Sequence, residues 1–210
     1  MSELLTYDPW ASVKSRNGIP ADELISMLQK SIRRGEVKNA LIAAYELHIS
    51  SPQLSDKLWR RLLTISVEDV GFGDPNAPEV IWSLYKSRRD FAYPDGDQPI
   101  LLVFAVRYLC RCRKDRSSDE LKYMRMKQVE HGALPEPPDV TYDMHTVKGR
   151  EMGRGRMHFL EEASRVEPEL DLPWVQRLYQ EYLDFCKAEE EQGEESLVEL
   201  FLNSCWDIKE

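Results

Sequence analysis

Apolar residues recur every three or four positions through most of this chain, which is the spacing of one helix face. Three runs show it first: Leu24, Ile25, Leu28 and Ile32; then Val37, Ala40, Leu41, Ala44 and Tyr45; then Leu54, Leu58, Leu62 and Ile65. The pattern predicts helices over residues 20–33, 36–49 and 54–70.

Two further helices are predicted before the middle of the chain. Asp74 and Pro75 combine a good N-cap residue with proline at the first helical position, so a fourth helix is expected to begin there and end near Arg89. The run from Ile100 to Leu109 is apolar almost all round and has a candidate cap at Asp97. We expect this run to form the central core helix.

The second half of the chain carries two more helical patterns. Residues 117–120 fit a capping box, which opens a helix that should stop before the prolines at 135, 137 and 138. Beyond a segment rich in glycine and arginine, residues 174–186 again show strong helical spacing. An acidic stretch over residues 189–195 then precedes a final apolar segment over residues 197–206.

These elements predict an all-α fold, a multi-helix orthogonal bundle with a smaller C-terminal helical subdomain. The proline cluster is the expected internal boundary. We therefore predict a helical domain over residues 1–134 and a C-terminal helical extension, packed on it, over residues 135–210.

Composition and charge narrow the class of protein. With 42% hydrophobic and 31% charged residues, the 210-residue chain is typical of a globular protein. No apolar run approaches the roughly 20 residues that span a bilayer, and no signal peptide is evident, so a cytoplasmic protein without membrane association is expected. The net charge of −9 argues against indiscriminate nucleic-acid binding but allows a local basic patch.

An ordered set of charged, glycine and proline residues begins within the third predicted helix and continues beyond its end. Arg60 and Arg61 lead into the run Ser66-Val67-Glu68-Asp69-Val70-Gly71, and Asp74-Pro75 follow. With residues 30–35 and the pair Tyr93-Pro94, this set resembles the C-terminal region of the family of replication-associated recombination protein A and Werner-helicase-interacting AAA+ ATPases. The resemblance covers residues 24–115.

In that family the region is a helical collar that joins protomers, usually into tetramers, while a separate AAA+ module binds ATP and engages DNA. The resemblance therefore implies a homo-oligomer, either a dimer or a tetramer, and DNA or a replication or repair protein as partner. The sequence contains no G-x-x-x-x-G-K-[ST] phosphate loop, so neither the ATPase activity nor a cofactor is expected. From Asp143 onward we expect the sequence to depart from the collar pattern.

Ordinary helix chemistry also accounts for part of this signature. Gly71 suits a helix C-cap, Asp74 an N-cap, and Arg60 with Arg61 a solvated helix face.

Two acidic residues of the signature need a further explanation. Glu68 and Asp69 fall in the last turn of a predicted helix, where the macrodipole disfavours anions. We expect them to have cationic partners such as Arg33 or Arg34, in this chain or in a neighbouring subunit.

The most unusual stretch runs from Asp143 to His158 and combines three glycines with a local excess of basic residues, namely Lys148, Arg150, Arg154 and Arg156. Guanidinium groups suit phosphate, and glycines allow close approach of backbone, so this stretch is a candidate phosphate or nucleic-acid site. It could instead be a helix start capped by Thr146, with glycines allowing close packing. Both interpretations remain open, although two charges flanking Gly155 are hard to desolvate together, and we expect them to be exposed.

Asp143, His145 and His158 also form a weak candidate for a metal or acid-base site, together with Glu161 and Glu162. Neither D-x-H nor H-x-x-E is a complete site, so no metal is expected.

The sequence thus predicts a non-catalytic binding and oligomerisation protein, which would contact DNA or a replication partner through the basic segment. The alternative is a small enzyme acting on a phosphorylated or nucleic-acid substrate. In that enzyme the same arginines would bind substrate, and Asp143, His145 or His158 would perform the chemistry.

Overall fold

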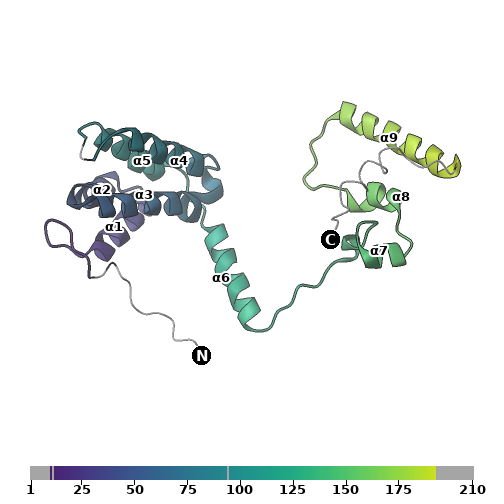
Figure 1. The fold of residues 1–210 in the computed structure, drawn as a ribbon, viewed down its shortest axis with the longest axis horizontal. Helices are drawn as coiled ribbons and strands as arrows, with labels where there is room; N and C mark the ends of the chain where they lie inside the picture. The colour runs from purple at the N-terminus through teal and green to yellow at the C-terminus, as the bar shows by residue number, and fades with distance from the viewer. Residues whose placement is uncertain (1–9, 11, 94, 193–210) are drawn as a thin grey trace, which may run out of the picture. The chain divides into compact units, whose positions relative to one another are not determined.

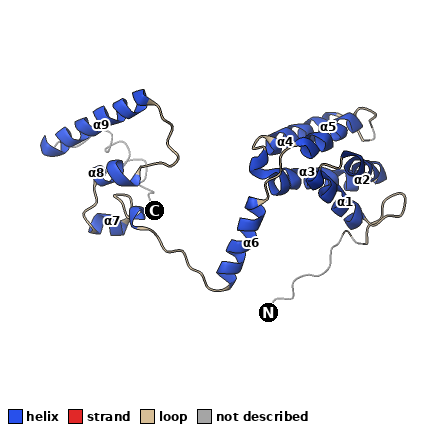
Figure 2. Ribbon diagram, turned by 180° about the vertical axis from the view of Figure 1, so that it is seen from behind, coloured by secondary structure: helices blue, strands red, loops and turns tan. Residues whose placement is uncertain are grey.

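The computed structural model describes residues 10, 12–93 and 95–192, and their regular structure is helical apart from one isolated β-bridge between Lys14 and Pro20 (Figures 1 and 2). The longer helices are α1 (Ala21–Arg34), α2 (Val37–Ser50), α3 (Pro52–Ile65), α4 (Ala77–Ser87), α5 (Gln98–Arg111), α6 (Ser117–Glu130) and α9 (Pro173–Gln192). The predicted all-α fold is confirmed.

The chain divides into two compact units, Met1–Ala133 and Leu134–Glu210, and the division immediately precedes the proline cluster. The first unit contains α1 to α6. The second contains shorter elements besides α9, namely η4 (Asp139–Thr141), α7 (Val147–Glu151), α8 (Arg156–His158) and η5 (Phe159–Ala163). Packing of the second unit on the first stays a prediction.

The core of the first unit lies between α1, α2, α3, α4 and α5, as the apolar spacing predicts. Leu28 and Ile32 of α1 are fully buried, and they face a helix whose buried positions include Ala40 and Ala44 of α2. Small alanine side chains let the two helices approach closely. Gly35 ends α1 in the left-handed conformation, with φ at 72°, and its amide donates to the carbonyl of Ile32.

The predicted helix over 54–70 is divided in two. Ser51 caps α3 by accepting a hydrogen bond from the amide of Leu54, and Pro52 occupies the first turn. From Ser66 to Val70 the chain widens into a π-helical turn, η1, before Gly71 ends it. A short 3-10 turn, η2 (Gly71–Gly73), follows.

The fourth helix begins later than predicted. It starts at Ala77, with Pro78 in its first turn, and Pro75 lies in the preceding turn. Asp74 is therefore not its N-cap, and that prediction is wrong. The Asp74 carboxylate instead accepts hydrogen bonds from the amide of Asn76 at 3.2 Å and from the hydroxyl of Tyr108 at 2.6 Å.

The run expected to form the central core helix, α5, contacts each of α1 to α4, but only one side of it is buried. Leu102, Val106 and Leu109 lie in the core, whereas Ile100 and Phe104 are exposed. The contacts agree with the predicted central helix, but α5 also presents an apolar surface to solvent.

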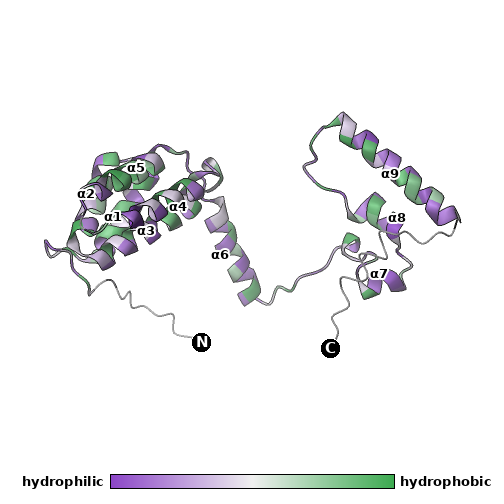
Figure 3. Ribbon diagram, turned by 45° about the horizontal axis from the view of Figure 1, so that its top comes forward, coloured by the Kyte–Doolittle hydropathy of each residue, from purple (hydrophilic) through white to green (hydrophobic). Residues whose placement is uncertain are grey.

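Helix α6 starts where the sequence predicts it, but without a capping box. Its N-cap is Arg116, and no side chain caps it; Asp115 accepts a hydrogen bond from the amide of Ser117 at the entry. Asp119 is the only buried residue of α6, and Figure 3 shows hydrophobic and hydrophilic residues mixed around this helix.

The second unit has a small core in which Leu160, Leu183 and Cys186 are buried against Met157 and Phe159. The helix predicted over 174–186 is confirmed within α9, while the apolar segment over 197–206 lies outside the described residues. Within the part of the chain that the structure describes, no helix is long and apolar enough to cross a membrane.

Candidate functional site

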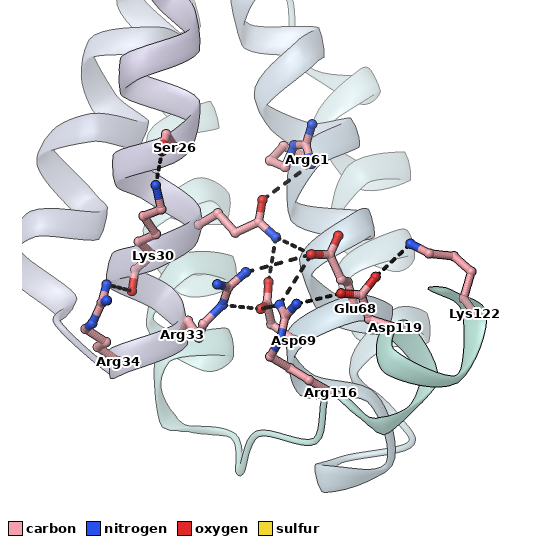
Figure 4. A network of polar contacts seen from close by, with 11 residues as sticks. Ser26, Lys30, Arg33, Arg34, Arg61, Glu68, Asp69, Arg116, Asp119 and Lys122 are labelled. Atoms are coloured by element: carbon pink, nitrogen blue, oxygen red, sulfur yellow. Dashed lines mark hydrogen bonds and ion pairs between the residues drawn. The ribbon is translucent and has the colours of Figure 1, made fainter. Parts of the chain in front are cut away.

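The two acidic residues of the signature lie at the centre of a polar network (Figure 4). The side chain of Asp69 is 0% exposed, and its carboxylate accepts hydrogen bonds from Nε of Arg33 at 2.5 Å, Nη1 of Arg116 at 2.7 Å and Nε2 of Gln29 at 2.8 Å. Glu68, one quarter exposed, lies 3.4 Å from Arg116 and 3.8 Å from Arg33. Two guanidinium groups thus balance two carboxylates.

Only part of this network was predictable. The expectation of a cationic partner such as Arg33 or Arg34 is confirmed by Arg33, which pairs with both acids, whereas Arg34 donates to the carbonyl of Lys30. Arg116 was not predicted, because 47 residues separate it from Asp69. It also binds Asp119, which Lys122 contacts at 2.6 Å, so the network extends from α1 through η1 into α6.

The glycines of the signature allow the segment before α6 to pass close to η1. Gly71 caps η1 as expected, with φ at 51°, and a Cβ added there would collide with the backbone carbonyl of Asp115. A Cβ on Gly73 would lie 2.5 Å from the carbonyl oxygen of Arg113. The amide of Asp115 donates to the carbonyls of Asp69 and Val70. The signature therefore joins two segments that are distant in sequence.

The two arginines of the signature differ from each other. Arg60 is exposed and pairs with Asp56 one turn earlier, in agreement with a solvated face. Arg61 is partly buried, and its Nη1 lies 3.4 Å from the side-chain oxygen of Gln29, so it borders the Asp69 network. The expectation of a fully solvated face is wrong for Arg61.

The segment from Asp143 to His158 folds as a short capped helix and a turn. Thr146 caps α7 by accepting from the amide of Gly149, which confirms the predicted cap. Gly149 is buried against the backbone of Asp143, where any Cβ would collide. Lys148 lies over the ring of Tyr142 at 3.9 Å, and Arg150 donates to the carbonyl of Met144.

Arg154 and Arg156, expected at the surface, are largely buried, and that expectation is wrong. The side chain of Arg154 is 16% exposed and donates to the carbonyls of Asp139 and Tyr142 as well as to the Asp139 carboxylate. Arg156 is 13% exposed and pairs with Glu189 at 3.0 Å while donating to the carbonyl of Cys186. Both guanidinium groups therefore form ion pairs and hydrogen bonds within the second unit. Phosphate binding by the segment stays a prediction, and these contacts favour the structural interpretation.

The weak metal candidate is only partly assembled. Nδ1 of His145 lies 3.0 Å from Oδ2 of Asp143, and this hydrogen bond lowers the pKa of the Asp143 carboxyl. Nδ1 of His158 is buried and has no hydrogen-bond partner among the described residues. Among the described residues, no group of three or more His, Cys, Asp or Glu side chains is placed to hold a metal ion.

One surface was not predicted at all, and it is formed by α2 and α5, which pack side by side. Ile42 and Tyr45 of α2 are 67% and 47% exposed, and Ile100 of α5 is 66% exposed. Between the helices lies a groove of about 370 Å³, lined by Lys38, Leu41, Ile42, Tyr45, Leu102 and Val103. We call this surface the α2–α5 face.

Comparison with known proteins shows which family this helical chain matches. A family model described as the MgsA AAA+ ATPase C terminal matches residues 50–192. Replication-associated recombination protein A of Bacillus subtilis (strain 168) is 29% identical over 133 residues, which are 63% of this chain and 31% of that relative. The match spans less than a third of the relative's length.

The family match begins later than the resemblance over residues 24–115 but extends further toward the C-terminus. It includes the segment from Asp143 to His158, so the expectation that the chain departs from the family pattern there is wrong. It also includes Asp69, Arg116 and the glycines between η1 and α4. Because it covers more than half of the sequence, the chain belongs to the family of MgsA AAA+ ATPase C-terminal regions.

Proposed function

We propose that this chain acts by binding and assembly, and that two copies associate through the α2–α5 face. The observation that carries the proposal is the apolar groove between α2 and α5, lined by the exposed Ile42, together with Ile100, which is exposed on α5. Contiguous exposed apolar surface of this kind is typical of an interaction site. The family resemblance, which implies a collar that joins protomers, supports the same interpretation.

The face suits a symmetric contact. In a two-fold dimer the same surface of each subunit meets its copy. A ridge on one subunit can therefore enter the groove of the other, and the reverse contact forms at the same time. Ile42 and Ile100 would be the ridge that enters the groove of the second copy. Such a contact forms a dimer, and a second interface would be needed for a tetramer.

A catalytic role is not favoured by the arrangement in the second unit. Arg154 and Arg156, two of the three arginines expected to bind substrate in the alternative enzyme, already pair with Asp139 and Glu189. The pair formed by the exposed His145 and the largely buried Asp143 has no third catalytic group in the contacts of the described residues. Association with DNA or with a replication or repair protein, and a cytoplasmic location, stay predictions.

The test is a pair of substitutions on the face, compared with a matched pair elsewhere. We expect Ile42→Asp with Ile100→Asp to convert an assembled protein to monomers in sedimentation velocity, because each buried carboxylate would lose its hydration. The control is Val166→Asp with Leu170→Asp, two exposed residues of the second unit that change charge equally. Equal masses for both variants would contradict this interface.

A further inference from the structure

The outward side of α5 changes from apolar to basic along the length of the helix. Ile100 and Phe104 lie on one stripe of the helix, and the next two turns of that stripe carry Arg107 and Arg111. Beside the stripe is a second hollow, of about 390 Å³, lined by Asp74, Phe104, Arg107, Tyr108, Arg111 and Cys112. We call it the α5 groove. It combines an aromatic surface with two guanidinium groups in an otherwise acidic protein.

The aromatic side of the groove is flat and held in place. The rings of Phe104 and Tyr108 are nearly parallel, with an interplanar angle of 7° and centroids 6.4 Å apart. Tyr108 is fixed by the hydrogen bond from its hydroxyl to Asp74, and burial together with this bond raises the pKa of Tyr108. Phe104 remains 56% exposed. An exposed ring on a rigid support is the kind of surface on which a planar group stacks.

On the basic side of the groove, no described residue pairs with either arginine. Arg107 and Arg111 are exposed, one helical turn apart, and neither has an ion pair or hydrogen bond within the described part of the chain. They are not needed to neutralise the helix end, because Lys114 donates to the carbonyls of Leu109, Cys110 and Cys112. Both guanidinium groups are therefore available to an anion.

We infer that the α5 groove binds single-stranded nucleic acid, with a base stacked on Phe104 and backbone phosphates on Arg107 and Arg111. Stacked aromatic rings beside a positive groove are the usual components of such binding. An acidic protein segment would use the arginines but would leave the flat aromatic surface without a planar ligand. In a duplex the bases are already stacked, so a single strand fits better. The inference rests on the proposed function and deepens it by naming a ligand that the assembled protein binds. This ligand would contact α5, and not residues 143–158.

The experiment measures fluorescence anisotropy of a labelled oligo(dT) of about 15 nucleotides, long enough for one groove, at low salt with the full chain. We expect Arg107→Ala with Arg111→Ala to weaken binding at least tenfold. The dependence of log affinity on log salt concentration should also flatten by about 0.7 for each phosphate that the variant no longer neutralises. Phe104→Ala should weaken binding about fivefold or more without changing the salt slope, because stacking involves no counterion release.

A charge-matched control separates the groove from general electrostatics. Arg165→Ala with Arg177→Ala removes the same two charges from exposed positions of the second unit, outside the segment from Asp143 to His158, and it should leave oligo(dT) binding within twofold of wild type. An equal decrease in affinity for both double variants would overturn the inference, as would wild-type protein that shows no binding at low salt. A labelled hexa-aspartate peptide that binds wild type, and not the Arg107–Arg111 variant, while oligo(dT) binds neither, would assign the groove to an acidic protein partner and also overturn it.

Sedimentation of the same samples keeps the two proposals apart. The Arg107–Arg111 variant should retain the wild-type mass, since neither side chain lies on the α2–α5 groove. Weakened binding with unchanged mass in that variant supports the inference. A monomeric wild-type protein that still binds oligo(dT) in an arginine-dependent way would contradict the proposed assembly alone.

Discussion

The guanidinium of Arg116 donates a hydrogen bond at 2.7 Å to the fully buried carboxylate of Asp69, which joins the start of α6 to the π-helical turn η1. A buried carboxylate is costly unless charged donors surround it. Here Arg33 supplies a second guanidinium from α1. The acidic residues at the end of a helical run are therefore the point at which three segments of the first unit are held together.

Replacing Asp69 should destabilise the first unit strongly. Asp69→Ala leaves Arg33 and Arg116 without their shared partner, and we expect the free energy of unfolding to fall by about 3 kcal/mol. Glu136→Ala, which removes an exposed carboxylate, should change it by less than about 0.5 kcal/mol. Urea denaturation of both variants checks this. Similar midpoints for the two would show that the network contributes little.

The glycines after η1 should tolerate no side chain. Gly73→Ala forces a Cβ against the backbone of Arg113, so the segment must move, and we expect a clearly lower melting temperature. Gly96→Ala is the matched control, because no atom lies within 4 Å of its added Cβ and its φ is not positive. Calorimetry of the two variants compares them directly. A Gly73→Ala variant as stable as Gly96→Ala would refute the close approach.

Buried His48 should make stability fall in mildly acidic solution. Burial, and then the nearby positive charge of Arg88, lowers the pKa of His48 below 6.5, so the folded state binds the proton less readily than the unfolded state. The contribution of neutral His48 is complete above the unfolded pKa. It is lost as pH falls from there through the folded pKa. His48→Gln should remove this part of the pH dependence, which urea denaturation at about pH 7.5 and pH 5 would detect. An unchanged difference between the two pH values would argue against it.

The two buried arginines of the second unit should act on its stability. Arg156→Ala removes the hydrogen bonds to Glu189 and the carbonyl of Cys186, and we expect local opening of α9 to become easier by about 1–2 kcal/mol. Arg150→Ala, which removes a hydrogen bond at an exposed position, is the control. Amide hydrogen exchange across α9 measures the difference. Unchanged exchange in Arg156→Ala, together with abolished oligonucleotide binding, would favour the phosphate interpretation of this segment.

The sequence predicts well those features that depend on neighbouring residues. Apolar spacing located α1 to α3 and α9, and the caps at Gly71 and Thr146 depend on residues within one turn. Features that depend on distant partners were missed. Asp74 resembles an N-cap in sequence, yet its carboxylate accepts a hydrogen bond from Tyr108, which is 34 residues away. Arg156 is largely buried and pairs with Glu189, which is 33 residues away. The apolar run of α5 did not reveal which of its sides lacks a covering helix.

The average mass in solution, followed by sedimentation equilibrium from nanomolar to micromolar concentration, tests the proposed assembly most directly. We expect a mass that rises with concentration from the monomer value of 24.5 kDa to twice or four times that value. We also expect the Ile42–Ile100 double variant to stay at the monomer mass. A wild-type mass of 24.5 kDa at every concentration would contradict the claim that this chain works by self-association.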